Sequence, residues 1–252
     1  MCTLTWHDTL DGYEVFFNRD ERRARKPAVP PAVRRRGDTR ILSPLDGDCG
    51  GTWIAVNEHG LTVCLLNGFP AQSPDTAAGD GYTSRGSIPL TAIECASSAE
   101  VARTLRACSL DCFRPFVLVA FEPGGVGLTA RWSGATLEID HGRPPLRPLV
   151  SSSFFTEEVR SSRIAVFESL QRERAGDTPT ELHLAFHRSH RPERGPHSPC
   201  MHRADASTVS FSHIEVGGAE VRFRYTASSP CRGLPEAPVV LPTRSAGEPS
   251  RS

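Results

Sequence analysis

The sequence predicts an α+β domain in which two β-sheets are covered on their outer sides by helices. Hairpin patterns lie near both ends of the chain, helical patterns lie between them, and turn residues separate the elements. The chain has 252 residues, of which 38% are hydrophobic, enough for a sizeable core in one or two domains. We expect a single domain over 1–231 and a disordered Pro-, Arg- and Ser-rich tail over 232–252.

Periodicity, turn residues and one helix cap justify the elements of the first half. Polar and apolar side chains alternate over the first strand, and Asp11-Gly12 supplies a tight turn into its partner. Ser97 and Glu100 form a capping box in front of a helical pattern. The expected elements are strands at 2–7, 13–17, 52–57 and 61–66, loops at 22–40 and 68–86, and helices at 88–96 and 98–110.

The second half follows from the same kinds of signal. The run FVLVAF is apolar throughout and predicts a buried strand, which a glycine cluster turns into the next hairpin. Thr178, Pro179 and Glu181 combine an N-cap, a first-turn proline and a capping-box carboxylate. The expected elements are strands at 116–121, 128–133, 135–140, 207–216 and 219–227, and helices at 156–174 and from 178 onward.

Charge and hydropathy exclude several classes of protein. The 29 basic and 29 acidic residues cancel, which argues against a general nucleic-acid or anionic-membrane binder. No apolar run approaches the roughly 18 residues of a spanning helix, so we predict no transmembrane segment. The first residues lack the pattern of a secretory signal. We therefore expect a cytoplasmic protein whose eight cysteines are free thiols.

Cys2 is the residue that most strongly suggests chemistry. Removal of the initiator methionine would leave Cys2 with a free α-amine, whose pKa of about 7.7–8.0 suits a base for its own thiol. The predicted hairpin returns Arg19 and Asp20 beside Cys2, where the guanidinium would lower the thiol pKa and the carboxylate could orient the amine. Asn67 could donate to an oxyanion. The alternative is that the cysteine is incidental and that 18–21 is an ordinary charged strand end.

Motifs in a fixed order carry a family resemblance. They are the N-terminal Met-Cys, the tetrapeptide NRDE at 18–21, GGTWIAVNEHGLTVCLLN at 50–67 and Ser84-Arg85-Gly86. This order resembles the NRDE family, the family of transport and Golgi organization protein 2. NEHGLTVCLLN also resembles a segment of the choloylglycine-hydrolase and penicillin-acylase group, N-terminal nucleophile (Ntn) hydrolases that cleave non-peptide amides. The resemblance implies a four-layer αββα sandwich of two antiparallel sheets between helices.

The resemblance also implies roles for individual residues. By match, Cys2 would be the nucleophile, Arg19 and Asp20 its partners on the second strand, and Asn67 an oxyanion donor. Further candidates for ligand binding lie in the same motifs, namely Asn18, Glu21 and Trp53. One departure stands out: where the relatives carry Leu-Ser/Thr-Asn, this chain has Val150-Ser151-Ser152-Ser153. The implied activity is hydrolysis or transfer of a non-peptide amide or acyl group, and an oxyanion-side asparagine is missing or substituted.

A carrier of haem or of a lipid-like ligand is the alternative function. Members of the family have been linked to haem mobilisation, lipid handling and organisation of the secretory pathway. Six His or Cys residues lie between 183 and 202, namely His183, His187, His190, His197, Cys200 and His202. Of these, His183 and His187 share one helical face at i, i+4, which can suit a metal or haem iron. The surrounding arginines and prolines favour a solvated connector instead, and no standard zinc spacing is present. We therefore predict no metal site and no cofactor, with haem as the ligand of the alternative. An interaction protein that uses the Arg-rich 22–36 loop is a third hypothesis, based on charge alone.

Overall fold

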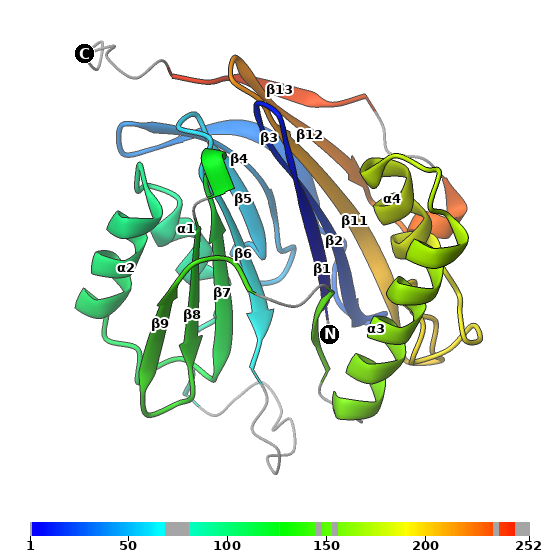
Figure 1. Cartoon of the computed structure of the whole chain (residues 1–252). Coiled ribbons are helices and arrows are strands. Elements are labelled where there is room, and N and C mark those ends of the chain that lie inside the picture. The colour runs from blue at the N-terminus through cyan, green and yellow to red at the C-terminus, as the bar shows by residue number, and fades with distance from the viewer. Residues whose placement is uncertain are drawn as a thin grey trace.

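Two antiparallel β-sheets pack face to face, and helices cover the outer face of each sheet (Figure 1). The structure is a computed structural model that describes residues 2–68, 81–125, 127–144, 148–152, 156–233 and 237–244. The layers follow one another as helices, sheet, sheet and helices, with α1 and α2 on one side and α3 and α4 on the other (Figure 1). This arrangement confirms the predicted four-layer αββα fold.

The first sheet contains the predicted N-terminal and C-terminal hairpins. Its strands run in the order β10-β1-β2-β11-β12-β13. The turn between β1 and β2 requires glycine at position 12, because a Cβ there would lie 1.9 Å from the carbonyl oxygen of Val216. The strands are β1 (Cys2–Thr9), β2 (Gly12–Arg22), β10 (Leu149–Ser151), β11 (Ala206–Val216), β12 (Glu220–Thr226) and β13 (Val239–Pro242).

The second sheet runs in sequence order from β3 to β9. Helices α1 (Ser87–Ala92) and α2 (Ser98–Ala107) lie against its outer face, and the Ser97 hydroxyl accepts from the Glu100 N–H as the expected cap of α2. The strands are β3 (Val29–Arg36), β4 (Thr39–Leu45), β5 (Ile54–Asn57), β6 (Thr62–Asn67), β7 (Phe116–Phe121), β8 (Gly127–Trp132) and β9 (Leu137–His141).

Helices α3 (Thr156–Glu173) and α4 (Pro179–Arg188) cover the first sheet. The capping box predicted at Thr178 is complete, since Thr178 and Glu181 each bond the backbone of the other. The outer face of β1 is polar, with Thr3, Thr5 and His7 buried beneath the helices. The contact between sheet and helices is therefore a layer of hydrogen bonds as well as of apolar packing.

Two stretches expected to be a loop or disordered contain strands. Residues 69–80, 234–236 and 245–252 lie outside the described residues, so most of the expected loop at 68–86 and the end of the tail stay predictions. Residues 22–40 were expected to be a loop, but they contain β3 and the start of β4. Because β3 is an edge strand, it tolerates Pro30 and Pro31 without breaking a sheet ladder. The expected disordered tail from 232 contains β13, where Leu241 is 1% exposed and Val239 pairs with Phe223. A short apolar run next to an open sheet edge outweighs the disordered-like composition around it.

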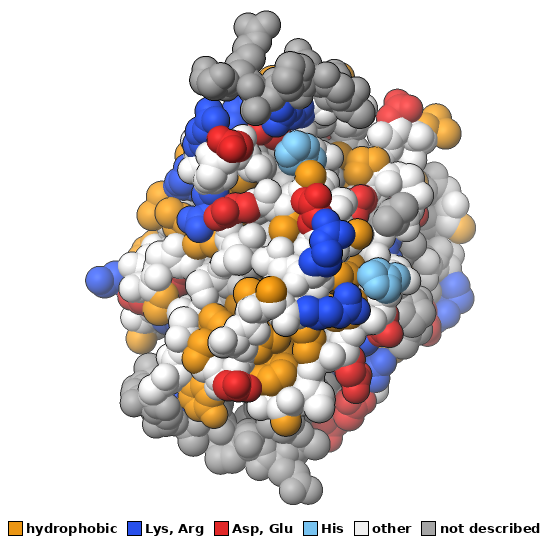
Figure 2. All heavy atoms as spheres, turned by 90° about the vertical axis from the view of Figure 1, so that its left-hand side faces the viewer, with side chains coloured by type: hydrophobic (Ala, Val, Ile, Leu, Met, Phe, Trp, Pro, Cys, Tyr) orange, Lys and Arg blue, Asp and Glu red, His pale blue; other side chains and the backbone are white. Residues whose placement is uncertain are grey.

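The core between the sheets is apolar and meets the site at one end. Leu4, Trp6 and Phe17 from the first sheet pack with Val119 and Phe121 from the second. Figure 2 shows the face over α1 and α2, on which acidic and basic side chains are interspersed with apolar areas. None of the described helices combines the length and the apolar character that crossing a bilayer requires.

Candidate active site

A cavity of about 320 Å³ brings the sequence motifs together. Its walls come from the start of β1, the end of β2, the turn after β4, the end of β6 and the segment 82–86 before α1. Cys2, Arg19, Asp20 and Asn67 all border it, although they come from three different strands. The cavity is therefore where the predicted catalytic residues meet.

Cys2 lies between two strands at the first described position of β1. It pairs with Arg19 on one side and with Ser151 on the other, so all three side chains project from the same face of the sheet. The side chain is buried, with Cys2 8% exposed. Burial raises the pKa of the Cys2 thiol and Asp20 raises it further, whereas Arg19 opposes both effects. A nearby base is therefore needed to form the thiolate near neutral pH.

Arg19 is held in place by an aromatic ring and a carboxylate. Its guanidinium lies 4.2 Å from the centre of the Trp53 ring, and its Nη2 donates to Asp46 Oδ2 at 2.5 Å. Glu21 lies 3.4 Å from the same nitrogen. Because these contacts come from separate segments, the orientation of Arg19 toward the cavity is strongly constrained.

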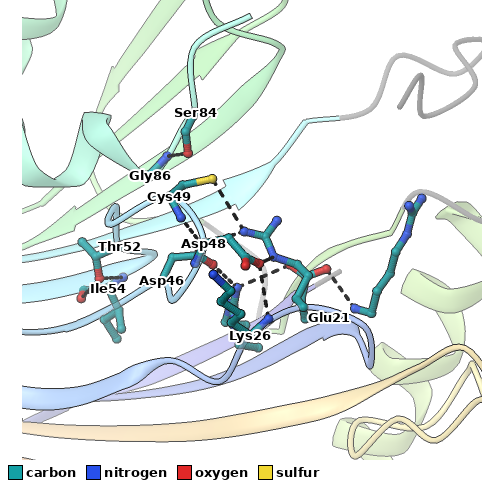
Figure 3. Close-up of polar contacts among 12 residues, drawn as sticks. Glu21, Lys26, Asp46, Asp48, Cys49, Thr52, Ile54, Ser84 and Gly86 are labelled. Carbon is teal, nitrogen blue, oxygen red and sulfur yellow. Dashed lines mark hydrogen bonds and ion pairs between the residues drawn. The ribbon is translucent and has the colours of Figure 1, made fainter. Parts of the chain in front are cut away.

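Asp46 joins two arginines and was not anticipated from the sequence. Its second oxygen accepts from Arg25 Nη2 at 2.6 Å, and the N–H groups of Asp48 and Cys49 also donate to it. Burial alone would raise the Asp46 pKa, but the Cys49 N–H and the two guanidinium groups lower it below its usual value. Figure 3 shows Asp46 and Asp48, on the turn after β4, close to Glu21.

Asp20 is engaged on the helix side of the sheet. Its Oδ2 accepts from both terminal nitrogens of Arg163 at 3.2 Å, and its Oδ1 accepts from the Thr208 hydroxyl at 2.6 Å. Arg163 and Asp20 are both fully buried side chains, and Arg163 also donates to the Thr3 hydroxyl. Asp20 still borders the cavity, so it connects the Cys2 end of β1 to helix α3.

The predicted ligand-binding residues divide into two groups. Glu21 and Trp53 border the cavity, as expected for ligand contact. Asn18 does not border it, because it pairs with Thr3 and shares the helix-facing side of the sheet. The Asn18 amide donates instead to the carbonyls of His187 at 2.9 Å and Pro199 at 2.8 Å. Alternation along β2 places neighbouring residues of one motif on opposite faces.

Two glycine-containing motifs touch each other at the cavity wall. The Thr52 N–H donates to the Gly86 carbonyl at 2.9 Å. A Cβ on Gly51 would lie 2.6 Å from the Gly86 carbonyl carbon, so Gly51 must lack a side chain. The Gly50-Gly51 pair and Ser84-Arg85-Gly86, which are distant in sequence, therefore form one wall.

Further residues border the cavity although the sequence did not point to their function. Arg85 donates to the Pro115 carbonyl at 2.8 Å, and the Arg114 guanidinium lies 5.4 Å from the centre of the Tyr82 ring. Arg25 and Asp46 complete this set. Only Arg85 carried a signal in the sequence, as the centre of the Ser84-Arg85-Gly86 motif.

Ser151 stands where the expected asparagine was missing. Pairing with Cys2 places the Val150-Ser151 segment beside the thiol, and Ser151 is 7% exposed. Its Oγ is buried and has no hydrogen-bond partner within the described residues. Ser153 lies outside the described residues. A hydroxyl therefore stands on the Cys2 side of the sheet, opposite the Arg19 strand.

His183 and His187 do not lie in a solvated connector. They are 2% and 0% exposed, and Thr5 Oγ1 lies 2.7 Å from His183 Nδ1 and 2.8 Å from His187 Nε2. The His183 ring stacks on Phe16 with 4.9 Å between ring centres. Burial holds the His187 pKa well below its usual value. This pair joins α4 to β1, because the Thr5 hydroxyl is hydrogen-bonded to His183 Nδ1 and to His187 Nε2.

The whole fold is similar to that of an acylase, a hydrolase and an amidase of known structure. Penicillin V acylase from Agrobacterium tumefaciens is 12% identical with a TM-score of 0.51, and the match covers 91% of this chain and 84% of the acylase. A variant of conjugated bile acid hydrolase from Clostridium perfringens is 11% identical with a TM-score of 0.54, covering 100% and 99%. The Caenorhabditis elegans N-acylethanolamine-hydrolyzing acid amidase ortholog is 10% identical with a TM-score of 0.52, covering 85% and 92%. At these identities the similarity shows the Ntn-hydrolase-like fold.

Sequence comparison identifies the family. Comparison with curated proteins gives no match. The model of the family Transport and Golgi organisation 2 matches residues 1–132, which include Cys2, residues 18–21 and the Ser84-Arg85-Gly86 wall of the cavity. The chain therefore belongs to the Transport and Golgi organisation 2 family and has an Ntn-hydrolase-like fold.

Proposed function

We propose that this protein hydrolyses a small non-peptide amide, or transfers its acyl group, with Cys2 as the nucleophile. The observation that carries the proposal is the position of Cys2, which borders a cavity and pairs with Arg19 in a fold shared with an acylase and an amidase. The cavity, at about 320 Å³, is at the small end of the range for ligand pockets. A small-molecule substrate fits such a volume.

The first step requires a base that the mature N-terminus supplies. Once the initiator methionine is removed, the Cys2 α-amine has a pKa of about 7.7–8.0 and takes the thiol proton. Arg19, across the β1–β2 ladder, favours the resulting thiolate. The thiolate sulfur then attacks the substrate carbonyl carbon, and the carbonyl electron pair moves to the oxygen.

Stabilisation and breakdown of the tetrahedral intermediate follow. The amide of Asn67, a residue that borders the cavity, and the Ser151 hydroxyl would donate to the oxyanion. Ser151 is a candidate donor because its Oγ is buried and has no hydrogen-bond partner within the described residues. The oxyanion re-forms the carbonyl as the C–N bond breaks, and the α-ammonium protonates the departing amine. Water, deprotonated by the same α-amine, hydrolyses the thioester and releases the acid.

The chemistry of the cavity wall suggests the kind of substrate. Arg25, Arg85 and Arg114 border the cavity together with Trp53 and Tyr82. Arginines bind carboxylates and phosphates with two parallel hydrogen bonds, and the rings offer apolar surface. We infer a substrate with an apolar portion and an acidic group. The eight free cysteines suit a reducing compartment, which supports a cytoplasmic location.

A non-catalytic carrier of haem or a lipid-like ligand is the second candidate. The same arginines would bind the carboxylates of haem or the acidic group of a lipid, and the description of the family as transport and Golgi organisation suits carriage. The His183 and His187 pair lends this candidate no support, because both rings face Thr5. A carrier would need only the cavity and not the Cys2 thiolate.

Substitution of Cys2 separates the two candidates. Purified protein is assayed against a panel of N-acyl amides, and binding of haem and of fatty-acyl probes is titrated in parallel. We expect Cys2→Ala to abolish amide turnover while ligand affinity changes little, because the thiolate acts in the transition state. Asn67→Ala should lower turnover about 10²–10³-fold. Cys112→Ser is the matched control, since Cys112 is an exposed cysteine outside the cavity.

Two outcomes would overturn the catalytic proposal. Intact mass of the mature protein showing a retained initiator methionine would remove the base. Turnover that survives Cys2→Ala would remove the nucleophile, whichever amide is cleaved.

A further inference from the structure

Two cysteines and two histidines converge outside the candidate active site. His190, Cys200, His202 and Cys231 each offer one ligand atom, and these atoms all lie within 4.8 Å of one another. His190 follows α4, Cys200 and His202 lie in the segment 189–205, and Cys231 belongs to the 3-10 turn η2 (Pro230–Arg232) after β12. The chain therefore brings together ligands that are up to 41 residues apart in sequence, from position 190 to position 231.

Two sulfur–nitrogen distances inside this cluster match those of a tetrahedral zinc site. Cys200 Sγ and Cys231 Sγ each lie 3.5 Å from His202 Nε2. In a tetrahedral site with Zn–S of about 2.3 Å and Zn–N of about 2.0–2.1 Å, sulfur and nitrogen ligands are separated by about 3.5 Å. The His190 and His202 rings meet edge to face with 5.1 Å between centres. His190 Nε2 is buried with no hydrogen-bond partner in the part of the chain that the structure describes.

We propose that His190, Cys200, His202 and Cys231 bind one Zn²⁺ ion as a closed structural site. Thiolate and imidazole are the ligands that zinc prefers, and four protein ligands without an open position are typical of structural rather than catalytic zinc. The two thiolates balance the charge of the ion, so the loaded site is neutral. His202 and Arg232 also border a second cavity of about 290 Å³, which gives the ion a path from solvent.

Hydrogen bonds hold Cys200 and the chain next to Cys231 in place. The Cys200 N–H donates to the Ser189 carbonyl at 3.0 Å, and the Cys200 carbonyl accepts from the Ser198 hydroxyl at 2.8 Å. Near Cys231, the Ser229 hydroxyl donates to the Thr208 carbonyl at 2.6 Å. Contacts of this kind orient metal ligands and reduce the entropy that binding must overcome.

The segment that carries the site explains what the ion would do. Residues 189–205, all of them described, contain no helix and no ladder strand, only a single bridge between His202 and Ser207. The Met201 N–H donates to the Thr208 hydroxyl at 2.8 Å, and that hydroxyl donates to Asp20. A zinc crosslink from this segment to η2 would therefore stabilise the anchor of Asp20 on β11 as well as the loop itself.

The sequence hides this site because its spacing is irregular. The ligand pair Cys200-x-His202 is followed by Cys231 after β11 and β12, and no CxxC pair is present. The prediction of no metal site rested on this missing spacing and on the arginines and prolines that favoured a solvated connector. Only the pairing of β11 with β12, which returns η2 toward residues 200–202, places the fourth ligand.

The test begins with the metal content of the full chain. The protein is purified under reducing conditions without chelator, desalted, and analysed by mass spectrometry for metals, with about one zinc per chain expected. Metal-free protein is then titrated with Zn²⁺ alone against a competing dye. Cys231→Ser and His190→Ala should each weaken Zn²⁺ binding at least 100-fold, because even contacts that only orient ligands are worth about 10–100-fold in metal affinity. Cys112→Ser, an exposed cysteine outside the cluster, should bind as the wild type does.

Two further readouts keep the test independent of amide turnover. Zn²⁺ should raise the melting temperature of metal-free wild type and of Cys112→Ser, and should leave that of Cys231→Ser unchanged. Co²⁺ should give the visible bands of tetrahedral thiolate coordination in the wild type but not in Cys231→Ser. If a variant fails to fold, the wild-type titration and the Co²⁺ spectrum still decide the question.

Three results would overturn the zinc site. The first is that the reduced wild type binds no Zn²⁺, and the second is that Cys231→Ser binds Zn²⁺ with wild-type affinity. The third is that protein purified without reductant carries a Cys200–Cys231 disulfide and binds no Zn²⁺ after that disulfide has been reduced. None of these results would bear on Cys2, since the cluster shares no residue with the 320 Å³ cavity.

Discussion

Cys2 and Arg19 lie directly opposite each other in the β1–β2 ladder, so both side chains project from the same face of the first sheet. The Arg19 guanidinium stacks on Trp53 and bonds Asp46, contacts that come from the residue before β5 and from the turn after β4. A positive charge is thereby held on the thiol side of the strand pair. Both contacts come from segments that flank strands of the second sheet, so the packing of the two sheets positions this charge beside Cys2.

Removal of the Arg19 charge should make the Cys2 thiol less reactive. Because Arg19 lowers the Cys2 pKa against the effect of burial, Arg19→Gln should raise that pKa and slow alkylation near neutral pH about tenfold. The rate is followed for the Cys2 peptide by mass spectrometry over a range of pH. Arg36→Gln, which removes a surface arginine that pairs with Glu94, is the control. An unchanged Cys2 rate in Arg19→Gln would show that Arg19 does not act on the thiol.

Breaking the buried ion pair of Asp20 and Arg163 should lower the free energy of unfolding more than breaking a surface ion pair. Arg163→Met leaves the Asp20 carboxylate buried without its cation, so the free energy of unfolding should fall by about 3–5 kcal/mol. Adding Asp20→Asn in the same chain should recover part of this loss, because the uncompensated charge is removed. Denaturant unfolding measures both variants. Asp140→Asn, which breaks an exposed pair with Arg131, should cost no more than about 1 kcal/mol. Equal losses in the two single variants would contradict this account of Asp20.

His187 should make the protein less stable in mild acid. The unfolded chain binds a proton at His187 near pH 6.5, whereas burial holds the folded pKa well below that value. Unfolding therefore takes up a proton, and the free energy of unfolding should fall as the pH drops below about 6.5. The contribution has a slope of up to about 1.4 kcal/mol per pH unit.

The His187→Gln variant tests this pH dependence. The slope of stability against pH between about 6.5 and 5 should become shallower, whatever the variant's stability at neutral pH. His141→Gln, at an exposed histidine, should keep the wild-type slope. A His187→Gln slope equal to that of wild type would assign the acid sensitivity to other groups.

Gly51 should tolerate no side chain, because the Gly86 backbone stands against it. A Cβ at position 51 would lie 2.6–2.9 Å from the Gly86 carbonyl carbon, Cα and oxygen, so Gly51→Ala must separate the two motifs of the cavity wall. We expect a loss of about 1–3 kcal/mol in the free energy of unfolding. Gly176→Ala is the control, since a Cβ there meets nothing within 4 Å. The melting temperatures of Gly51→Ala and Gly176→Ala are compared. Similar values would contradict the close approach of Gly51 to the Gly86 backbone.

Local signals in the sequence predicted most of the regular structure. FVLVAF is β7 with the same bounds as expected, and the caps at Ser97 and Thr178 start α2 and α4 where predicted. These signals work because alternation, apolar runs and caps act within a few residues. The strands that were missed are β3, β4, β10 and β13. Of these, β3, β10 and β13 lie at sheet edges, and β4 lies between β3 and β5, so pairing with neighbouring strands and not local pattern decides their conformation.

The candidate site was predictable in part, since Arg19 was expected beside Cys2 from the hairpin alone. Asp46 was not, because its carboxylate reaches Arg19 from a turn 27 residues away in sequence. Asn18, predicted to bind a ligand, faces the helices and bonds the His187 and Pro199 carbonyls, because successive residues of a strand project from opposite faces. Position along the hairpin predicted that Arg19 lies beside Cys2, but it did not predict which side chains bond Arg19.

The sequence by itself determined most of the elements, the hairpin that joins Cys2 to Arg19, and the family, since each depends on patterns of neighbouring residues. Only the tertiary structure decided which side chains meet. It engaged Asp20 with Arg163, turned His183 and His187 to Thr5, and assembled His190, Cys200, His202 and Cys231 into one cluster. The physical reason is that these contacts join residues far apart in the chain, and their formation depends on how two sheets and four helices pack, which no local pattern specifies.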